Sequence, residues 1–96
     1  MELFIFARFH AIAGCESEVR EMLHAQRLRV ADEPGCLSIH AFRSTRNPRL
    51  FYLHSRWVDE AAFDVHTAHA NTTRFVEWIE KLIDHPLDVT RTTLLD

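Results

Sequence analysis

Residues 33 to 75 constrain the fold of this chain more than any other part of the sequence. A Pro-Gly pair near the start of this stretch ends a helix, because both residues interrupt helical backbone. Two segments with alternating apolar and polar residues follow, 37–42 and 50–58, joined by a short turn with an Asn-Pro pair. Alternation with a period of two predicts strands, and the short connection predicts an antiparallel hairpin.

The remaining segments surround this hairpin with helices and further strands. Residues 3–11 and 87–94 also alternate, which predicts a first and a last strand. Apolar residues recur at helical spacing in 15–33, and a helix with Asp59 as its N-cap is expected to run to about residue 69. A restart at residue 71 or 72 continues the helix with an apolar stripe that we expect in the core: Phe75, Trp78, Ile79, Leu82 and Ile83.

The order of these elements predicts the fold class. Strand-helix-strand-strand-helix-strand is the split βαβ or ferredoxin-like arrangement, an α+β fold with one antiparallel sheet and both helices on one face. A chain of 96 residues without repeats or linkers fits one domain, so residues 1–96 are expected to form a single unit.

The two faces of the predicted sheet both carry large apolar residues. Residues of one strand parity, among them Leu37, Ile39 and Trp57, are expected to face the helices. The opposite face carries four aromatic residues: Phe4, Phe6, Phe42 and Tyr52. An open patch of this kind is unusual on a monomer, so we predict a homodimer that packs through this face. Scattered surface aromatics on a monomer are the alternative.

Composition removes several classes of function. A net charge of −3 with dispersed arginines provides no basic stripe for nucleic acid. No apolar run approaches the ~20 residues of a membrane span, and the first residues lack the pattern of a signal peptide. Cys15 and Cys36 match no closely spaced metal pattern. We therefore expect reduced cysteines, a cytoplasmic protein, and neither nucleic acid nor membrane as a partner.

Seven histidines raise the question of a metal site. His66 and His69 share a helix face, but no Glu-x-x-His or His-Glu-x-x-His pattern accompanies them. His10, His40 and His54 share a sheet face, where hydrogen bonding in an interface is the favoured interpretation over metal binding. A phosphate-binding glycine loop is also absent. We expect no metal and no cofactor.

His66 is the strongest candidate for chemistry. It lies about two turns into the helix capped by Asp59, on the same face as Phe63. An imidazole titrates near neutral pH and can act as a general base. From the residues alone, a half-buried helix histidine bonded to a neighbour is an equally good interpretation. Trp57 could line one pocket with His66, although a tryptophan at a strand end is commonly core.

The chain resembles the antibiotic biosynthesis monooxygenase family over nearly its whole length. The most specific matches are the Pro-Gly-Cys-Leu turn at 34–37, the run from Trp57 through Asp-Glu-Ala-Ala-Phe, and the position of His66. The resemblance implies a dimeric α+β barrel with a hydrophobic pocket between sheet and helices in each subunit. Relatives often carry glutamate where Ser55 stands and a second histidine where Asn71 stands.

The resemblance further implies a cofactor-independent monooxygenase that oxidises a small aromatic quinol or phenol with molecular oxygen. The implied site has one catalytic residue, His66, and five substrate-binding residues: Ser55, Trp57, His69, Asn71 and Phe75. The histidine would hold the substrate's hydroxyl proton, the aromatic members would shape the pocket, and the polar members would orient the substrate. The first strand lacks the asparagine usual in haem-degrading relatives, which counts against haem. The alternative is a non-oxygenase member of the fold, either a small-molecule isomerase or a non-catalytic dimeric binding protein.

Overall fold

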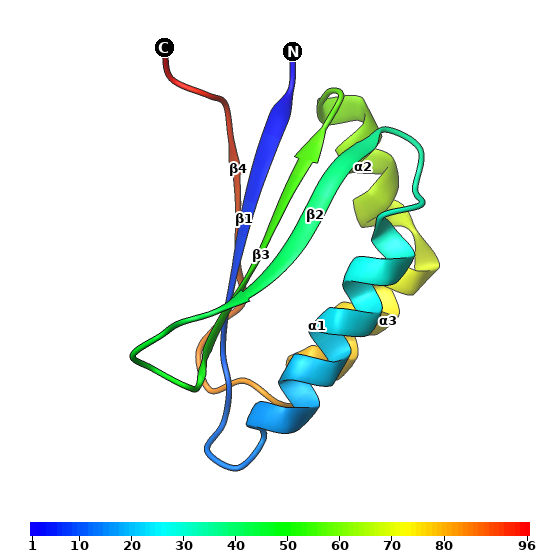
Figure 1. Ribbon diagram of the computed structural model, residues 1–96. Coiled ribbons are helices and arrows are strands. Elements are labelled where there is room, and N and C mark those ends of the chain that lie inside the picture. The colour runs from blue at the N-terminus through cyan, green and yellow to red at the C-terminus, as the bar shows by residue number, and fades with distance from the viewer.

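The computed structural model describes residues 1–96, and its elements follow the predicted ferredoxin-like order (Figure 1). Along the chain they are β1 (Leu3–His10), α1 (Glu16–Val30), β2 (Cys36–Arg43), β3 (Leu50–Trp57), α2 (Glu60–Ala68), α3 (Ala70–Ile79) and β4 (Asp88–Thr92). The α+β prediction is therefore confirmed, with the second helical segment divided into two helices.

The four strands form one antiparallel sheet in the order β2-β3-β1-β4. The two central strands, β1 and β3, pair along their whole length, from Leu3 opposite Trp57 to His10 opposite Leu50. All three helices lie on one side of the sheet, and the other side is open (Figure 1). This two-layer arrangement leaves a single interior, between sheet and helices.

Strand β3 shows why the alternating pattern predicted this interior correctly. Every second residue is buried, including Phe51 at one end and Trp57 at the other, and these side chains face the helices. Burying one large apolar side chain contributes ~1.5–3 kcal/mol to folding. The largest fully buried side chains come from both layers: Trp57, Phe9, Leu23, Ile79, Val19 and Val30.

The second helical segment breaks at His69, whose backbone is extended (φ −71°, ψ 139°). The imidazole Nδ1 of His69 accepts a hydrogen bond from the backbone N–H of Asn71 at 3.1 Å and so caps the start of α3. The break changes the direction of the chain between α2 and α3, which both lie on the same side of the sheet (Figure 1). None of the three helices has the length and apolar character needed to cross a membrane.

The predicted stripe of this segment is not helical beyond Ile79, where α3 ends, although Leu82 and Ile83 still pack in or against the core. Ile83 is buried, and its backbone forms an isolated bridge with Ala11 instead of a helical turn. Trp78 is 60% exposed, because the core-facing side of α3 is centred between Phe75 and Ile79 and Trp78 points away from it. The indole lies instead beneath the ammonium of Lys81 on the surface.

A bulge at the start of β2 corrects a second expectation. The pairing with β3 shifts between Cys36 and Ser38, so Leu37 is an extra residue in the ladder. Leu37 is 47% exposed and does not pack against the helices as predicted, because the bulge gives the inward position to Cys36. Ile39, beyond the bulge, is buried as predicted.

The open face of the sheet carries the four aromatic residues that the alternation assigned to it. Phe6 and Phe42 are each about half exposed, at 50% and 51%. The ring of His54 stacks on Phe6 at a centroid distance of 4.5 Å and on Phe4 at 6.3 Å. A cross-strand partner of His54 is His40, whereas His10 lies at the far end of β1. Within one chain, His10 therefore lies apart from the His40–His54 pair.

Candidate active site

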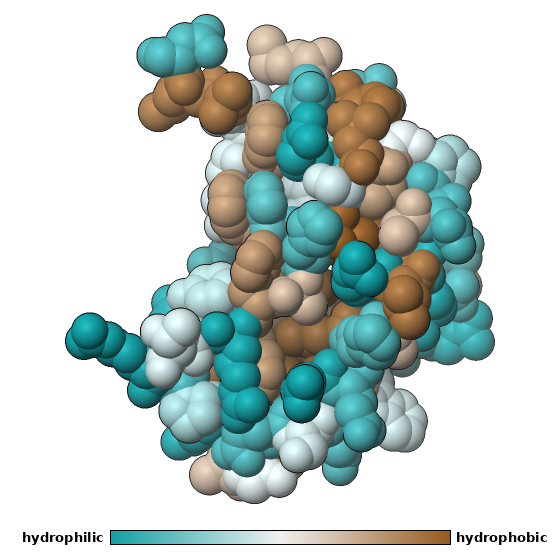
Figure 2. Space-filling model, viewed as in Figure 1, coloured by the Kyte–Doolittle hydropathy of each residue, from teal (hydrophilic) through white to brown (hydrophobic).

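A cavity of about 520 Å³ lies between the sheet and the helices. This volume falls within the range of small-molecule sites, ~300–1,000 Å³. Side chains from all seven elements line the cavity, and most of them are apolar. Figure 2 shows hydrophobic residues along the seam between sheet and helices, bordered by hydrophilic ones. Among the lining residues from β1, β2 and β3, Ser55 is the only polar one.

His66 enters this cavity from α2. The helix starts at a fixed point because the Asp59 carboxylate accepts a hydrogen bond from the Ala62 backbone N–H at 2.8 Å. The imidazole packs against two rings, with centroid distances of 5.0 Å to Trp57 and 5.3 Å to Phe63. Only 11% of the His66 side chain is exposed. Its position is therefore fixed by a helix cap and by aromatic packing.

A carboxylate holds one nitrogen of this imidazole. Nδ1 of His66 lies 2.8 Å from Oε1 of Glu33 and 3.3 Å from the hydroxyl of Thr72. The other nitrogen, Nε2, makes no hydrogen bond within the chain. Every fully buried side-chain nitrogen or oxygen has a hydrogen-bond partner, so Nε2 must be accessible. Because His66 lines the cavity, we infer that Nε2 is accessible from there. The pair presents a ring nitrogen to a ligand while a carboxylate holds the opposite side of the ring.

Glu33 reaches His66 because of the turn that follows it. Gly35 has a φ of +85°, and a Cβ at this position would lie 2.5 Å from the Cβ of Ala62. Only glycine permits both this backbone conformation and this approach to the first turn of α2. The Glu33–His66 pair was not predicted from the sequence. The only local signal was an acidic residue directly before the Pro-Gly turn.

Trp57 and Ser55 form a second polar contact at the floor of the cavity. The indole N–H of Trp57 donates a hydrogen bond to Oγ of Ser55 at 3.0 Å. Ser55 lines the cavity, whereas Trp57 is completely buried and lies behind His66 without reaching the lining. Trp57 therefore supports the site from beneath, and the pocket wall assigned to it is formed in part by Phe63.

The other three predicted substrate-binding residues divide between two places. Phe75 lines the cavity and packs edge-on against Phe9 at 6.1 Å. His69 and Asn71 lie outside the lining, at the exposed joint between α2 and α3. There His69 caps α3, and the side-chain oxygen of Asn71 accepts a hydrogen bond from Arg74 at 2.9 Å. The break between the helices is what moves both residues away from the cavity.

Arg91 of β4 is a lining residue that the sequence did not indicate. Its Nη1 forms ion pairs with Glu60 at 3.0 Å and Asp64 at 2.7 Å, both on α2. The guanidinium carbon lies 4.9 Å from the centroid of the Phe63 ring. The hydrogen bond to Asp64 is the main cause of the raised pKa of Arg91. These contacts connect the edge strand to α2 beside the cavity.

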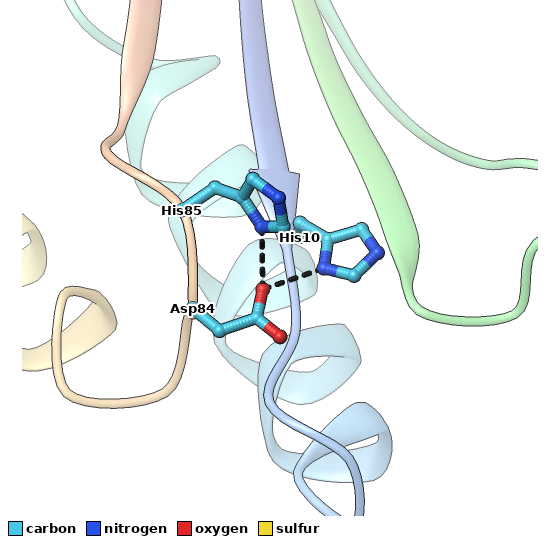
Figure 3. Close-up of side chains that lie close together, drawn as sticks. All are labelled: His10, Asp84 and His85. Carbon is cyan, nitrogen blue, oxygen red and sulfur yellow. Dashed lines mark hydrogen bonds and ion pairs between the residues drawn. The ribbon is translucent and has the colours of Figure 1, made fainter.

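A separate cluster lies at the other end of β1, where His10, Asp84 and His85 meet (Figure 3). Nδ1 of each histidine is 2.6 Å from Oδ1 of Asp84, and Arg49 binds the other carboxylate oxygen. The hydrogen bonds from His10 and then His85 lower the pKa of Asp84 to about 2. The three ligand atoms lie within 4.8 Å of one another, close enough to share a metal ion.

Two contacts indicate that this cluster is a structural hydrogen-bond network and not a metal centre. The Arg49 guanidinium is a cation on the same carboxylate that a metal ion would need. The amide oxygen of Asn47 accepts the Arg49 backbone N–H, so its NH₂ group faces Nε2 of His10 at 3.4 Å. This contact favours the tautomer with the proton on Nδ1, which donates to Asp84. The cluster joins β1 to the segment after α3.

The fold and the cavity define a class: ferredoxin-like α+β proteins with an apolar cavity between sheet and helices. Residues 3–78 match the sequence profile described as antibiotic biosynthesis monooxygenase, and the chain belongs to this family. No protein of curated function matches the sequence significantly.

Several solved structures share this fold. Rv0793 from Mycobacterium tuberculosis is 24% identical, with a TM-score of 0.92 over 100% of this chain and 97% of that chain. PA3566 from Pseudomonas aeruginosa is 24% identical, with a TM-score of 0.89 over 99% and 95%. A structure named antibiotic biosynthesis monooxygenase is 23% identical, with a TM-score of 0.90 over 98% and 99%. At these identities the likeness establishes the fold alone.

Proposed function

We propose that this chain is a cofactor-independent monooxygenase that acts on a small aromatic quinol or phenol. The observation that carries the proposal is the free Nε2 of His66 in an apolar cavity, with Nδ1 held by Glu33. A base that faces an apolar space can deprotonate a phenolic hydroxyl and leave the phenolate poorly solvated. Family membership supports the same reaction class.

The proposed reaction begins with proton transfer from the substrate hydroxyl to Nε2 of His66. The Glu33 carboxylate then faces the imidazolium across Nδ1 and stabilises its positive charge. The electron-rich phenolate reduces oxygen directly, and a carbon–oxygen bond forms within the cavity. For a hydroquinone, one oxygen atom is added to a ring carbon and the other leaves as water. The substrate itself supplies the two electrons that reduce this second oxygen atom. The product is a hydroxyquinone.

Oxygen uptake with a panel of hydroquinones and naphthols tests this proposal. His66→Ala is expected to reduce kcat by 10²-fold or more, which is the usual scale of general base catalysis. His24→Ala is the matched control, because His24 is an exposed histidine of α1 outside the cavity. Uptake at the background rate with every substrate, or equal rates for His66→Ala and the unmodified protein, would reject the oxygenase.

Glu33→Gln separates positioning from binding in the same assay. The amide keeps a hydrogen-bonding group next to His66 but removes the charge that stabilises the imidazolium. We expect kcat to fall about tenfold while KM changes little, because the charge matters most after the proton has moved. A rise in KM at constant kcat would assign Glu33 to substrate binding instead.

The proposal includes a homodimer joined through the open sheet face and a location in the cytoplasm. The half-exposed Phe6 and Phe42 support the dimer, because both lie on the face that no helix covers. Molecular oxygen and the aromatic substrate are the small-molecule partners. If the protein binds phenols without consuming oxygen, the non-catalytic binding protein of the same fold replaces the oxygenase.

A further inference from the structure

We propose that Gln26 and Ser55 form a subsite that binds an acceptor oxygen of the ligand, separate from the hydroxyl that His66 receives. This inference rests on the proposed use of the cavity as the substrate site. It adds a specificity that the base alone does not provide. Both residues line the cavity, and both are more than nine-tenths buried, at 3% exposure for Gln26 and 5% for Ser55.

Gln26 occupies a core-facing position of α1, where an apolar residue would be expected. Its amide oxygen accepts a hydrogen bond from Nη2 of Arg29 at 2.5 Å. A guanidinium has only donors, so the oxygen must face Arg29 and the NH₂ group must point the other way. This nitrogen makes no hydrogen bond within the chain. Since every fully buried side-chain nitrogen has a partner, the nitrogen of Gln26 must be accessible. The NH₂ group therefore opens on the cavity that Gln26 lines.

Ser55 supplies the second donor. Its oxygen accepts the indole N–H of Trp57 at 3.0 Å, and this is the only hydrogen bond of the side chain. The hydroxyl hydrogen thus has no acceptor in the protein. Its cross-strand neighbours on the floor, Ile5 and Ile39, are apolar, so they offer it no side-chain acceptor. A ligand in the cavity is the available acceptor for this hydrogen.

The chemistry of the two donors identifies the ligand group. An amide NH₂ and a hydroxyl both donate, which suits an oxygen that only accepts, such as a ketone or quinone carbonyl. His66 requires an ionisable hydroxyl elsewhere on the same molecule. The substrate class is therefore an aromatic that carries both a phenolic hydroxyl and a carbonyl oxygen. A ligand with an alkyl group in place of the carbonyl would leave both donors unpaired in an apolar site.

Calorimetric titration under nitrogen with 4-hydroxyacetophenone and 4-isopropylphenol tests the subsite without any turnover. The two phenols have nearly the same shape, and one has a carbonyl oxygen where the other has a methyl group. We expect the ratio of their affinities to shift about five- to tenfold against the ketone in Gln26→Met and in Ser55→Ala. Thr67→Val is the matched control, because Thr67 also lines the cavity but its hydroxyl already donates to the Asp64 carbonyl at 2.9 Å.

An affinity ratio that is the same in the unmodified protein and in both variants would overturn the subsite, as would failure of the unmodified protein to bind the ketone. Gln26→Met keeps the test valid if Ser55→Ala disturbs folding by removing the acceptor of the Trp57 indole. Since oxygen is absent, a shifted ratio supports the subsite even if oxygen uptake fails. An unchanged ratio with normal oxygen uptake rejects the subsite and leaves the oxygenase intact.

Discussion

At the scale of single residues, Asp84 connects its own segment to two distant parts of the chain, through His10 and Arg49, and also bonds its neighbour His85. Its carboxylate must be ionised to accept all of these bonds. The pKa of Asp84 is lowered to about 2 from an ordinary value of 3.8. A lowered pKa means that the stabilising contribution is complete above about pH 4 and is lost as the pH falls through 2.

Asp84→Asn is therefore expected to lower the urea midpoint at pH 6 and to flatten the loss of stability between pH 4 and pH 2. Urea unfolding at a series of pH values, followed by circular dichroism, measures both effects. Asp88→Asn provides a control, because Asp88 is an exposed acid whose side chain bonds only Thr90. An equally steep loss of stability between pH 4 and pH 2 in the Asp84 variant and the unmodified protein would contradict this role.

The residues of the site show which parts of it the sequence could predict. His66 was predicted because its helix position follows from a local cap and local spacing. Its partner Glu33 was not, because the two are 33 positions apart and meet only when the turn packs on α2. Gln26 was also not predicted as a site residue, since it stands where helical spacing predicts an apolar residue. A buried polar residue on such a stripe is the signal that could have identified it.

At the scale of the elements, the turn between α1 and β2 determines where α2 lies. Gly35→Ala places a methyl group 2.5 Å from Ala62 and forces a φ of +85° on a residue that disfavours it. We expect a loss of ~2–4 kcal/mol in the free energy of unfolding, the scale of strain combined with overpacking. We also expect lower activity, because displaced α2 carries His66 away from Glu33.

Gly14→Ala is the matched control for this substitution. Gly14 has a similar φ of +95°, but no atom lies within 4 Å of its added Cβ. Its cost should be limited to backbone strain, ~1–2 kcal/mol, with activity retained. Urea unfolding of both variants gives the comparison. Equal losses of stability would show that contact with α2 contributes nothing at Gly35.

The elements themselves were largely predictable, because strand alternation and helix caps are local signals. Where the prediction failed, a local irregularity was the cause. The bulge at Leu37 reversed the side that this residue faces, and α3 ends at Ile79, before the predicted helical stripe is complete. Trp78 is an exception: it was assigned to the core as part of the helical stripe that starts at Phe75, but its angular position on α3 places it outside.

At the scale of the whole molecule, the open sheet face is the main apolar surface that the fold leaves uncovered by helices. We expect light scattering at micromolar concentration to give twice the mass of the 96-residue chain. Phe42→Asp should shift the mass toward that of a monomer, because it places a charge in the proposed interface.

Trp78→Asp serves as the control for this prediction, since Trp78 is 60% exposed on a helix and not on the sheet. It should leave the mass unchanged. A monomeric mass for the unmodified protein would exclude the dimer. A monomer produced equally by both substitutions would assign the interface to some other surface.

The break at His69 gives the cavity roof a hinge-like joint between two short helices. The joint is exposed and lies outside the hydrogen-bond ladder of the sheet. A residue added or removed there would therefore change the direction of α3 without disturbing any strand. Phe75 and Thr72 would move with α3, while His66 would stay with α2. A change of chain length at this one point would thus enlarge or shrink the cavity and leave His66 in place.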